Sequence, residues 1–163
     1  MDIEGSCFCG AVHFRAVSHT PYPYLRCYCS FCCKTSGSGG YAINIMAQAD
    51  SLRVRGDTEV GFHHGREHDP RTDQLVASPG KRFFCRHCGS PLWGADPRWA
   101  EWFYPFASAI DTPLPQPPET VHIMLEFTAP WVTVPEGEGH RHFPRYPDAS
   151  ILEWHRRWGL IQP

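Results

Sequence analysis

The sequence lacks the features of several large classes of protein. None of its apolar runs reaches the roughly 18 residues of a membrane-spanning helix, so no membrane association is expected. Its 15 Lys and Arg do not outnumber its 17 Asp and Glu, so no nucleic-acid-binding surface is predicted. The acidic start has no basic and apolar signal peptide. No repeat or domain boundary is evident in the 163 residues, so we expect a single domain, 1–163.

Cysteine, by contrast, is abundant. Seven of the eight cysteines form three clusters. The clusters are Cys7-x-Cys9, Cys27-x-Cys29-x-x-Cys32 and Cys85-x-x-Cys88. Because no signal peptide is expected, we place the protein in the reducing cytoplasm, where such spacings are typical of metal sites and not of disulfides. The one-residue gaps also give poor geometry for a disulfide within a cluster.

Two of the clusters are pairs, and two pairs supply the four ligands of a tetrahedral zinc. A glycine follows each pair, and glycine allows the positive φ that turns backbone amides towards the sulfurs. We therefore assign Cys7, Cys9, Cys85 and Cys88 to a structural zinc. This zinc would join the N-terminal hairpin to the middle of the chain and contribute directly to folding.

The third cluster, Cys27, Cys29 and Cys32, is one ligand short of a tetrahedron. A nearby histidine could complete it, the candidates being His63, His64, His68 and His87. Cys33 could complete it, although a direct neighbour of Cys32 points away in most backbone conformations. We favour the third alternative, an open position for solvent or substrate, as in catalytic zinc sites. A zinc there would bind an incoming thiol and hold it as a thiolate beside an electrophile.

Basic side chains adjoin the clusters at Lys34, Lys81, Arg82 and Arg86. They could compensate the thiolate charge, bind a carboxylate of the thiol, or be solvated surface charges. The other conspicuous side chains have structural interpretations. Trp93, Trp99 and Trp102 are expected in the core or a pocket wall, Trp131 and Trp158 as packing anchors, and His155 on a helix surface.

Short strand patterns, punctuated by Gly, Pro, Asp or Ser, indicate a mainly β fold. The predicted strands cover residues 11–17, 41–46, 52–55, 59–63, 82–85, 103–107 and 121–127. Residues 63–79 and 111–119 are predicted to be loops. One helix is predicted near the C-terminus, with Asp148 as N-cap, Gly159 as its end and an apolar stripe at Ile151, Trp154 or His155, and Trp158. A shorter helical turn is predicted at 30–34.

The cysteine motifs resemble those of the glutathione-dependent formaldehyde-activating enzyme family, which includes the centromere protein V type. The resemblance rests on GSCFCG at 5–10, CYCSFC at 27–32 followed by SGS at 36–38, and FCRHCGSPL at 84–92. It continues through Ile110-Asp111 and 122–131 and ends at 154–156, so it covers nearly the whole chain. Tyr28 stands where the family commonly has His, and residues 63–71 match no substrate-binding motif of the family.

This resemblance implies a β-tent fold with two zinc ions per chain. The zinc on Cys7, Cys9, Cys85 and Cys88 would be structural, and the zinc on Cys27, Cys29 and Cys32 catalytic. The implied enzyme is a carbon–sulfur lyase or synthase, whose substrates are a small-molecule thiol and an aldehyde. Glutathione would bind the catalytic zinc and add to formaldehyde, giving S-hydroxymethylglutathione. Two other functions are considered: a non-catalytic, zinc-stabilised module that binds a protein partner, and a site that transfers or senses metal.

Overall fold

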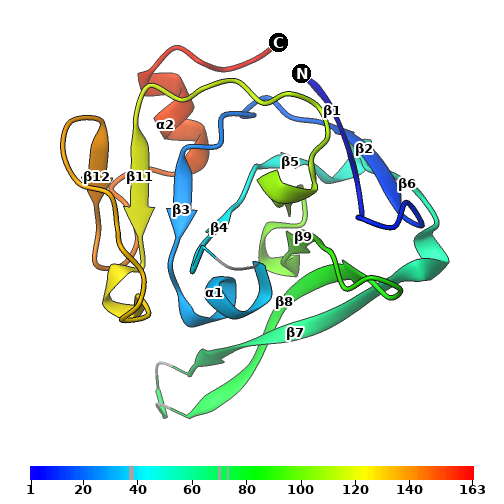
Figure 1. Ribbon diagram of the computed structural model, residues 1–163, viewed down its shortest axis with the longest axis horizontal. Helices are drawn as coiled ribbons and strands as arrows, with labels where there is room; N and C mark the ends of the chain where they lie inside the picture. Colours follow the sequence, from blue (N-terminus) through cyan, green and yellow to red (C-terminus); the bar gives the residue numbers. More distant parts are fainter. Residues whose placement is uncertain (37–38, 70, 73) are drawn as a thin grey trace.

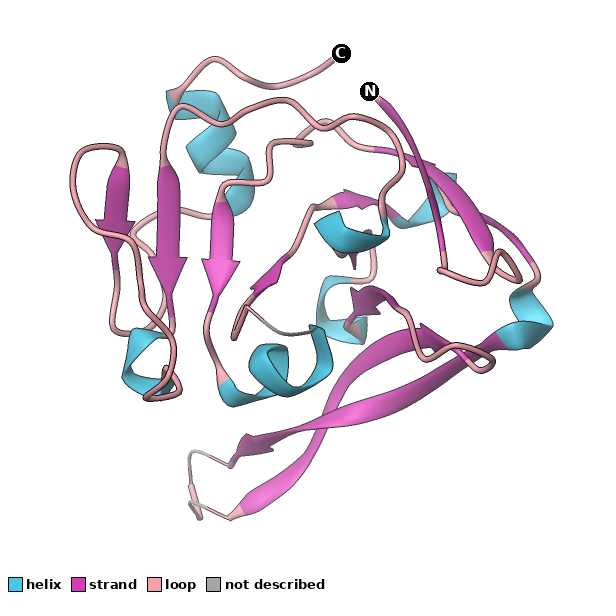
Figure 2. Cartoon of the chain, in the orientation of Figure 1, coloured by secondary structure: helices cyan, strands magenta, loops and turns pink. Residues whose placement is uncertain are grey.

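The computed structural model describes residues 1–36, 39–69, 71, 72 and 74–163, without the side chains of Ser36, His68 and Leu75. Its described strands form three sheets (Figures 1 and 2). The first sheet has the order β1 (Asp2–Ser6), β2 (His13–Val17), β6 (Arg53–Arg55). The second has the order β5 (Ala47–Gln48), β10 (Trp102–Pro105), β9 (Pro91–Ala95), β8 (Leu75–Cys85), β7 (Val60–His68). The third has the order β12 (His140–His142), β11 (Thr120–Ile123), β3 (Leu25–Cys27), β4 (Ala42–Ile43).

The prediction of a mainly β fold built from short antiparallel sheets is confirmed, with one addition. In the third sheet β11 pairs in parallel with both β3 and β12. Parallel neighbours need a long connection, and here nearly a hundred residues separate β3 from β11. This pairing sets Ile123 opposite Cys27 and His122 opposite Arg26, which no local sequence pattern indicates.

The described part of the chain has two α-helices, and both are short. The first, α1 (Ser30–Ser36), confirms the predicted helical turn after Cys29. The second, α2 (Ile151–Arg157), confirms the predicted C-terminal helix, and Gly159 follows it with a φ of 66°. Five 3₁₀ turns are η1 (Ala49–Ser51), η2 (Asp57–Glu59), η3 (Pro97–Trp99), η4 (Ala107–Ala109) and η5 (Leu125–Phe127). No described helix is long and apolar enough to cross a membrane.

The predicted N-cap of α2 was wrong. Ser150, and not Asp148, caps the helix: the Ser150 hydroxyl accepts a hydrogen bond from the Glu153 amide, and the Glu153 carboxylate accepts one from the Ser150 amide. This reciprocal arrangement satisfies two amides and so outcompetes a single aspartate cap. Asp148 instead forms ion pairs with Arg141 and Arg157.

The loop predicted for residues 63–79 was also wrong. β7 and β8 continue through this stretch as one long antiparallel hairpin, with an irregularity between His64 and Arg66. In Figure 1 the hairpin extends away from the rest of the molecule, below α1. Its polar composition reflects solvent exposure and not the absence of pairing. The proline-rich segment 111–119 does lack helix and strand, as predicted.

The core consists of two apolar clusters. The first contains Ile3, Phe14, Trp93 and Phe103 together with Cys7 and Cys85. The second contains Tyr24, Val121, Trp154 and Phe106 together with Cys27 and Cys32. Each set of clustered cysteines is therefore anchored to its own core.

Some of the aromatic predictions fail. Trp93 lies in the core, as expected, but Trp99, Trp131 and Trp158 are largely exposed. His155, expected on a helix surface, is fully buried. Its Nδ1 donates to the carbonyl of Ile151 and its Nε2 accepts the amide of Tyr22. These two hydrogen bonds make burial of the imidazole tolerable.

Candidate metal centres

The structure brings Cys7, Cys9, Cys85 and Cys88 together. All four sulfurs lie within 4.8 Å of one another, with Cys7 Sγ 3.6 Å from Cys9 Sγ and Cys9 Sγ 3.7 Å from Cys85 Sγ. Four sulfurs bound to one zinc at about 2.3 Å in a tetrahedron would be about 3.8 Å apart, so the donor set fits zinc. The separations are too long for disulfides. We call these residues the four-cysteine cluster.

The backbone around the four-cysteine cluster turns towards the sulfurs. Gly10 and Gly89 have φ values of 75° and 72°, which fit the role expected for a glycine after each pair. The Val12 amide donates to Cys7 Sγ at 3.2 Å. The Ser90 hydroxyl bonds to Cys88 Sγ and accepts the amide of Phe8, thereby linking the two turns. Hydrogen bonds from the Ser90 hydroxyl and amide lower the pKa of Cys88 to about 5.

The second set, Cys27, Cys29 and Cys32, comes from one continuous stretch of chain. Cys27 ends β3, Cys32 lies in α1, and the three sulfurs are within 4.8 Å of one another. The Cys32 amide donates to Cys29 Sγ at 3.3 Å. Cys27 and Cys32 are buried, whereas Cys29 is half-buried. We call these residues the three-cysteine cluster.

Hydrogen bonds among the three thiols shift their pKa values in opposite directions. Hydrogen bonds from the thiols of Cys27 and Cys32 lower the pKa of Cys29 to about 2. The same pairing with Cys29 is the main cause that raises the pKa of Cys27. Soft sulfur donors packed this closely are the ligands that zinc prefers, because a cation can replace the shared protons. The three-cysteine cluster therefore also fits zinc.

None of the candidate histidines with a described side chain joins these sulfurs. His64 donates to a backbone carbonyl of β8, and His87 pairs with Glu59 at 2.6 Å. The ring of His63 packs against aromatic rings instead. The side chain of His68 lies outside the described part of the structure. The assignment of an open fourth position stays a prediction.

Cys33 does not contribute a sulfur to the cluster. Its amide donates to the carbonyl of Cys29, as the helical geometry of α1 requires, and its side chain is half-buried. Of the basic residues near the clusters, Lys34 and Arg82 line a cavity of 290 Å³ beside α1. A second cavity of 190 Å³ is lined by Tyr41 and Ser108. Phe106 borders both cavities.

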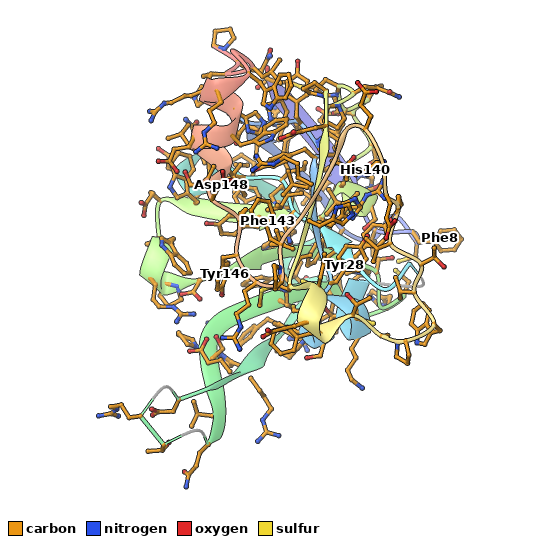
Figure 3. The ribbon with its side chains drawn as sticks, turned by 90° about the vertical axis from the view of Figure 1, so that its left-hand side faces the viewer. Phe8, Tyr28, His140, Phe143, Tyr146 and Asp148 are labelled. Atoms are coloured by element: carbon orange, nitrogen blue, oxygen red, sulfur yellow. The ribbon has the colours of Figure 1, made fainter. Side chains whose placement is uncertain are left out.

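Tyr28, between two of the cysteines, begins a buried polar network that the sequence did not reveal. Its hydroxyl bonds to His122 Nδ1 at 2.9 Å, and His122 Nε2 bonds to His140 Nδ1 at 2.9 Å. Figure 3 labels Tyr28 and His140, at the two ends of this chain of hydrogen bonds. The ring of His142 stacks on that of His122. The alternation of His140 and His142 was the available signal, since it places both on one face of a strand.

Burial lowers the pKa of His122 to about 4, and the charges of His142 and Arg26 contribute. The imidazole is therefore neutral at pH 7 and acts as a hydrogen-bonding link. Through Tyr28 it holds the segment between Cys27 and Cys29 against β11. The network thus fixes the position of the three-cysteine cluster without supplying a ligand.

The fold and the two clusters define a mainly β protein with two cysteine-rich candidate metal centres. The sequence profile of the family described as glutathione-dependent formaldehyde-activating enzyme matches residues 2–125, which include both clusters. The chain belongs to this family.

Two proteins are similar to this chain. A protein of Halomonas elongata is 54% identical over 160 residues, which cover 98% of each chain. Its name, glutathione-dependent formaldehyde-activating enzyme, is itself given provisionally. A crystal structure of a Rhodobacter sphaeroides protein superposes with a TM-score of 0.52 at 26% identity, covering 69% of this chain and 91% of the other.

Proposed function

We propose that the protein is a zinc-dependent carbon–sulfur lyase or synthase that forms or cleaves a glutathione adduct such as S-hydroxymethylglutathione. The observation that carries this proposal is the convergence of the three sulfurs of Cys27, Cys29 and Cys32, which no described fourth ligand joins. The family description and the name of the Halomonas relative support glutathione and formaldehyde as the substrates.

A zinc ion on the three-cysteine cluster would supply a position for the glutathione sulfur and stabilise its thiolate form. The chain positions this site. Cys27 and Cys32 are embedded in apolar packing, which excludes water from one side, and the half-buried Cys29 marks the accessible side. The Cys32 amide orients Cys29 Sγ by its hydrogen bond.

The reaction balances without an oxidant or a reductant. The glutathione sulfur attacks the carbonyl carbon of formaldehyde, so a C–S bond forms as the C=O π bond breaks. The proton lost by the thiol ends on the former carbonyl oxygen, which gives the hydroxymethyl group. The reverse reaction cleaves the same C–S bond and returns the free thiol and aldehyde.

We further propose that Cys7, Cys9, Cys85 and Cys88 hold a structural zinc within a single domain, 1–163. This ion would fasten the turn between β1 and β2 to the end of β8. Both sites require thiolates, which supports a reducing compartment such as the cytoplasm.

Zinc stoichiometry, glutathione binding and adduct formation test the proposal together. We expect two zinc ions per chain, calorimetric binding of glutathione, and S-hydroxymethylglutathione formation faster than the spontaneous rate when followed by NMR. Cys33→Ala is the matched control, because Cys33 adjoins Cys32 but does not contribute a sulfur to the three-cysteine cluster.

The alternatives predict other results. One zinc per chain without glutathione binding would favour the non-catalytic interaction module. A second zinc that chelators remove readily, with no effect of glutathione on its retention, would favour metal transfer or sensing. Either result would overturn the enzymatic proposal.

A further inference from the structure

A cavity of 290 Å³ separates α1 from strands β8 and β9. Lys34 and Thr35 line it from α1, Arg82 lines it from β8, and Phe84 and Phe106 form apolar walls. Phe106 packs in the same buried cluster as Cys27 and Cys32. Phe106 therefore belongs both to the cavity lining and to the core cluster of the sulfurs, and the charge of Arg82 acts on Cys32.

Arg82 contacts aromatic rings in this cavity, and none of the described carboxylates pairs with it. Its guanidinium carbon lies 4.6 Å from the ring centroid of Phe31 and 5.9 Å from that of Phe106. Arg82 Nε is buried and has no described hydrogen-bond partner. A buried donor without a partner is costly, unless a ligand accepts its hydrogen bond during function.

The surrounding acidic groups do not neutralise Arg82. Asp96 and Glu67 both pair with Arg98, at 2.7 and 3.3 Å. Hydrogen bonds from Arg98 are the main cause of the lowered pKa of Asp96, to which the charge of Arg82 adds. Among the described residues no carboxylate forms an ion pair with Arg82.

Two glycines leave space for the side chains of Arg82 and Phe31. A Cβ on Gly94, which pairs with Arg82 across the sheet, would lie 2.7 Å from Arg82 Nη1. A Cβ on Gly65 would lie 2.6 Å from Phe31 Cε1, the ring beneath the guanidinium. Both glycines thus accommodate the stacking of Arg82, from β8, on the ring of Phe31, from α1.

We propose that this cavity binds a carboxylate of the thiol co-substrate, with Arg82 as its principal ligand and Lys34 as a second positive charge. The inference rests on the proposed function of the three-cysteine cluster. A guanidinium binds the two oxygens of a planar carboxylate through parallel hydrogen bonds. Glutathione carries a thiol and two carboxylates, so one molecule can place its sulfur at the cluster and a carboxylate against Arg82. Arg82 is then a specificity-determining residue that favours acidic thiols over neutral or basic ones.

Three ligands test the inference on the zinc-loaded full chain. Glutathione has both thiol and carboxylates, S-methylglutathione has the carboxylates without a free thiol, and cysteamine has a thiol without a carboxylate. In Arg82→Gln we expect the calorimetric Kd for glutathione to rise roughly 10- to 100-fold, because a charge-assisted pair is lost. Binding of S-methylglutathione should be abolished, while cysteamine should bind as in the wild type. Arg82→Lys should recover part of the glutathione affinity.

Lys34→Gln is a second variant, at a solvent-exposed residue. It should raise the Kd for glutathione by several-fold and leave cysteamine unchanged. Arg156→Gln is the matched control, since it removes one exposed positive charge from α2 and should leave all three ligands unaffected. Circular dichroism confirms that each variant is folded.

Unchanged glutathione affinity in Arg82→Gln and Lys34→Gln would overturn the inference. An equal weakening of cysteamine would also overturn it, because Arg82 would then act only by compensating the thiolates. Failure of the proposed function gives a different pattern. The wild type would then not bind cysteamine, and the thiol of glutathione would contribute nothing to its binding. Arg82-dependent binding of S-methylglutathione would support the cavity even then.

Discussion

The two cysteine clusters differ most in how far apart their members lie along the chain. In the four-cysteine cluster, Cys9 and Cys85 are 76 residues apart, so a bound metal cross-links distant segments. In the three-cysteine cluster, Cys27 and Cys32 belong to one stretch that β3 and α1 already shape. Closing a long loop stabilises the native state much more than joining neighbours does. The comparison predicts that the first cluster serves stability, whereas the second can be used for chemistry at little cost to folding.

Removing one ligand from the four-cysteine cluster should have the largest effect. We expect Cys88→Ala to abolish cooperative folding, because structural zinc contributes on the order of 10 kcal/mol, comparable to the whole stability of a small domain. Cys88 is exposed, so the substitution leaves no cavity and the loss would reflect the metal site and not core packing. Thermal unfolding followed by circular dichroism, with zinc analysis, measures it.

Phe8→Ala is the control for this prediction. Phe8 lies between Cys7 and Cys9 in the other turn of the four-cysteine cluster, is 94% exposed and projects from the molecule in Figure 3, so its removal should leave the melting temperature almost unchanged. If Cys88→Ala kept the wild-type melting temperature, the four-cysteine cluster would not be the stabilising one and the comparison would fail.

The equivalent change in the three-cysteine cluster should leave a folded protein. We expect Cys29→Ala to lose glutathione binding and at least about 100-fold in activity, because two sulfurs cannot hold the ion in place. Its melting temperature should fall by only a few degrees, since Cys29 is not in the buried core. Unfolding of Cys29→Ala to the extent expected for Cys88→Ala would remove the distinction between the clusters.

The clusters could be recognised from sequence because metal binding imposes short, regular spacings on the ligands. Other parts could not. Residues 63–79 of the β7–β8 hairpin were predicted to be a loop because exposed strands carry polar residues, and their pairing leaves no mark in composition. The contact between Tyr28 and His122 spans 94 residues and depends on the parallel pairing of β3 with β11. Arg82 was named among the basic residues, but only the fold shows that no carboxylate in the described part of the chain pairs with it.

The histidine network gives the three-cysteine region its own dependence on pH. The pKa of His122 is about 4 in the folded protein, below its ordinary value, so the unfolded chain takes up a proton first as the pH falls. The stability that neutral His122 contributes is therefore complete above about pH 6.5 and is lost towards pH 4, by up to about 3 kcal/mol. In His122→Gln this part of the pH dependence should disappear.

Urea unfolding between pH 7 and pH 4.5 measures the effect as the difference between the two proteins. Thiolate protonation and the buried His155 affect both proteins alike and cancel in that difference. Exposed His64→Gln should retain the wild-type pH dependence. Parallel curves for the wild type and His122→Gln would show that the network does not titrate with unfolding.

The smallest expected effect is that of a substitution in strand β9, which separates the regions of the two cysteine clusters. Trp93 packs into the core that holds Cys7 and Cys85, whereas the next residue, Gly94, pairs with Arg82 beside the three-cysteine cluster. Alternate strand positions point to opposite faces, so a change at Gly94 should affect one region only. We expect Gly94→Ala to weaken glutathione binding by several-fold, with a stability change under about 1 kcal/mol, because the added methyl displaces only the flexible end of Arg82.

A double-mutant cycle decides whether Gly94 acts through Arg82. If it does, Gly94→Ala should cause no further loss of glutathione affinity once Arg82 is replaced by Gln. The coupling free energy between the two sites should then equal the whole effect of Gly94→Ala alone. Calorimetric titration of the four proteins with glutathione supplies the values, and cysteamine should give the same Kd in all four. Additive effects would mean that the methyl group perturbs the cluster itself. The separation of the two regions by β9 would then be incomplete.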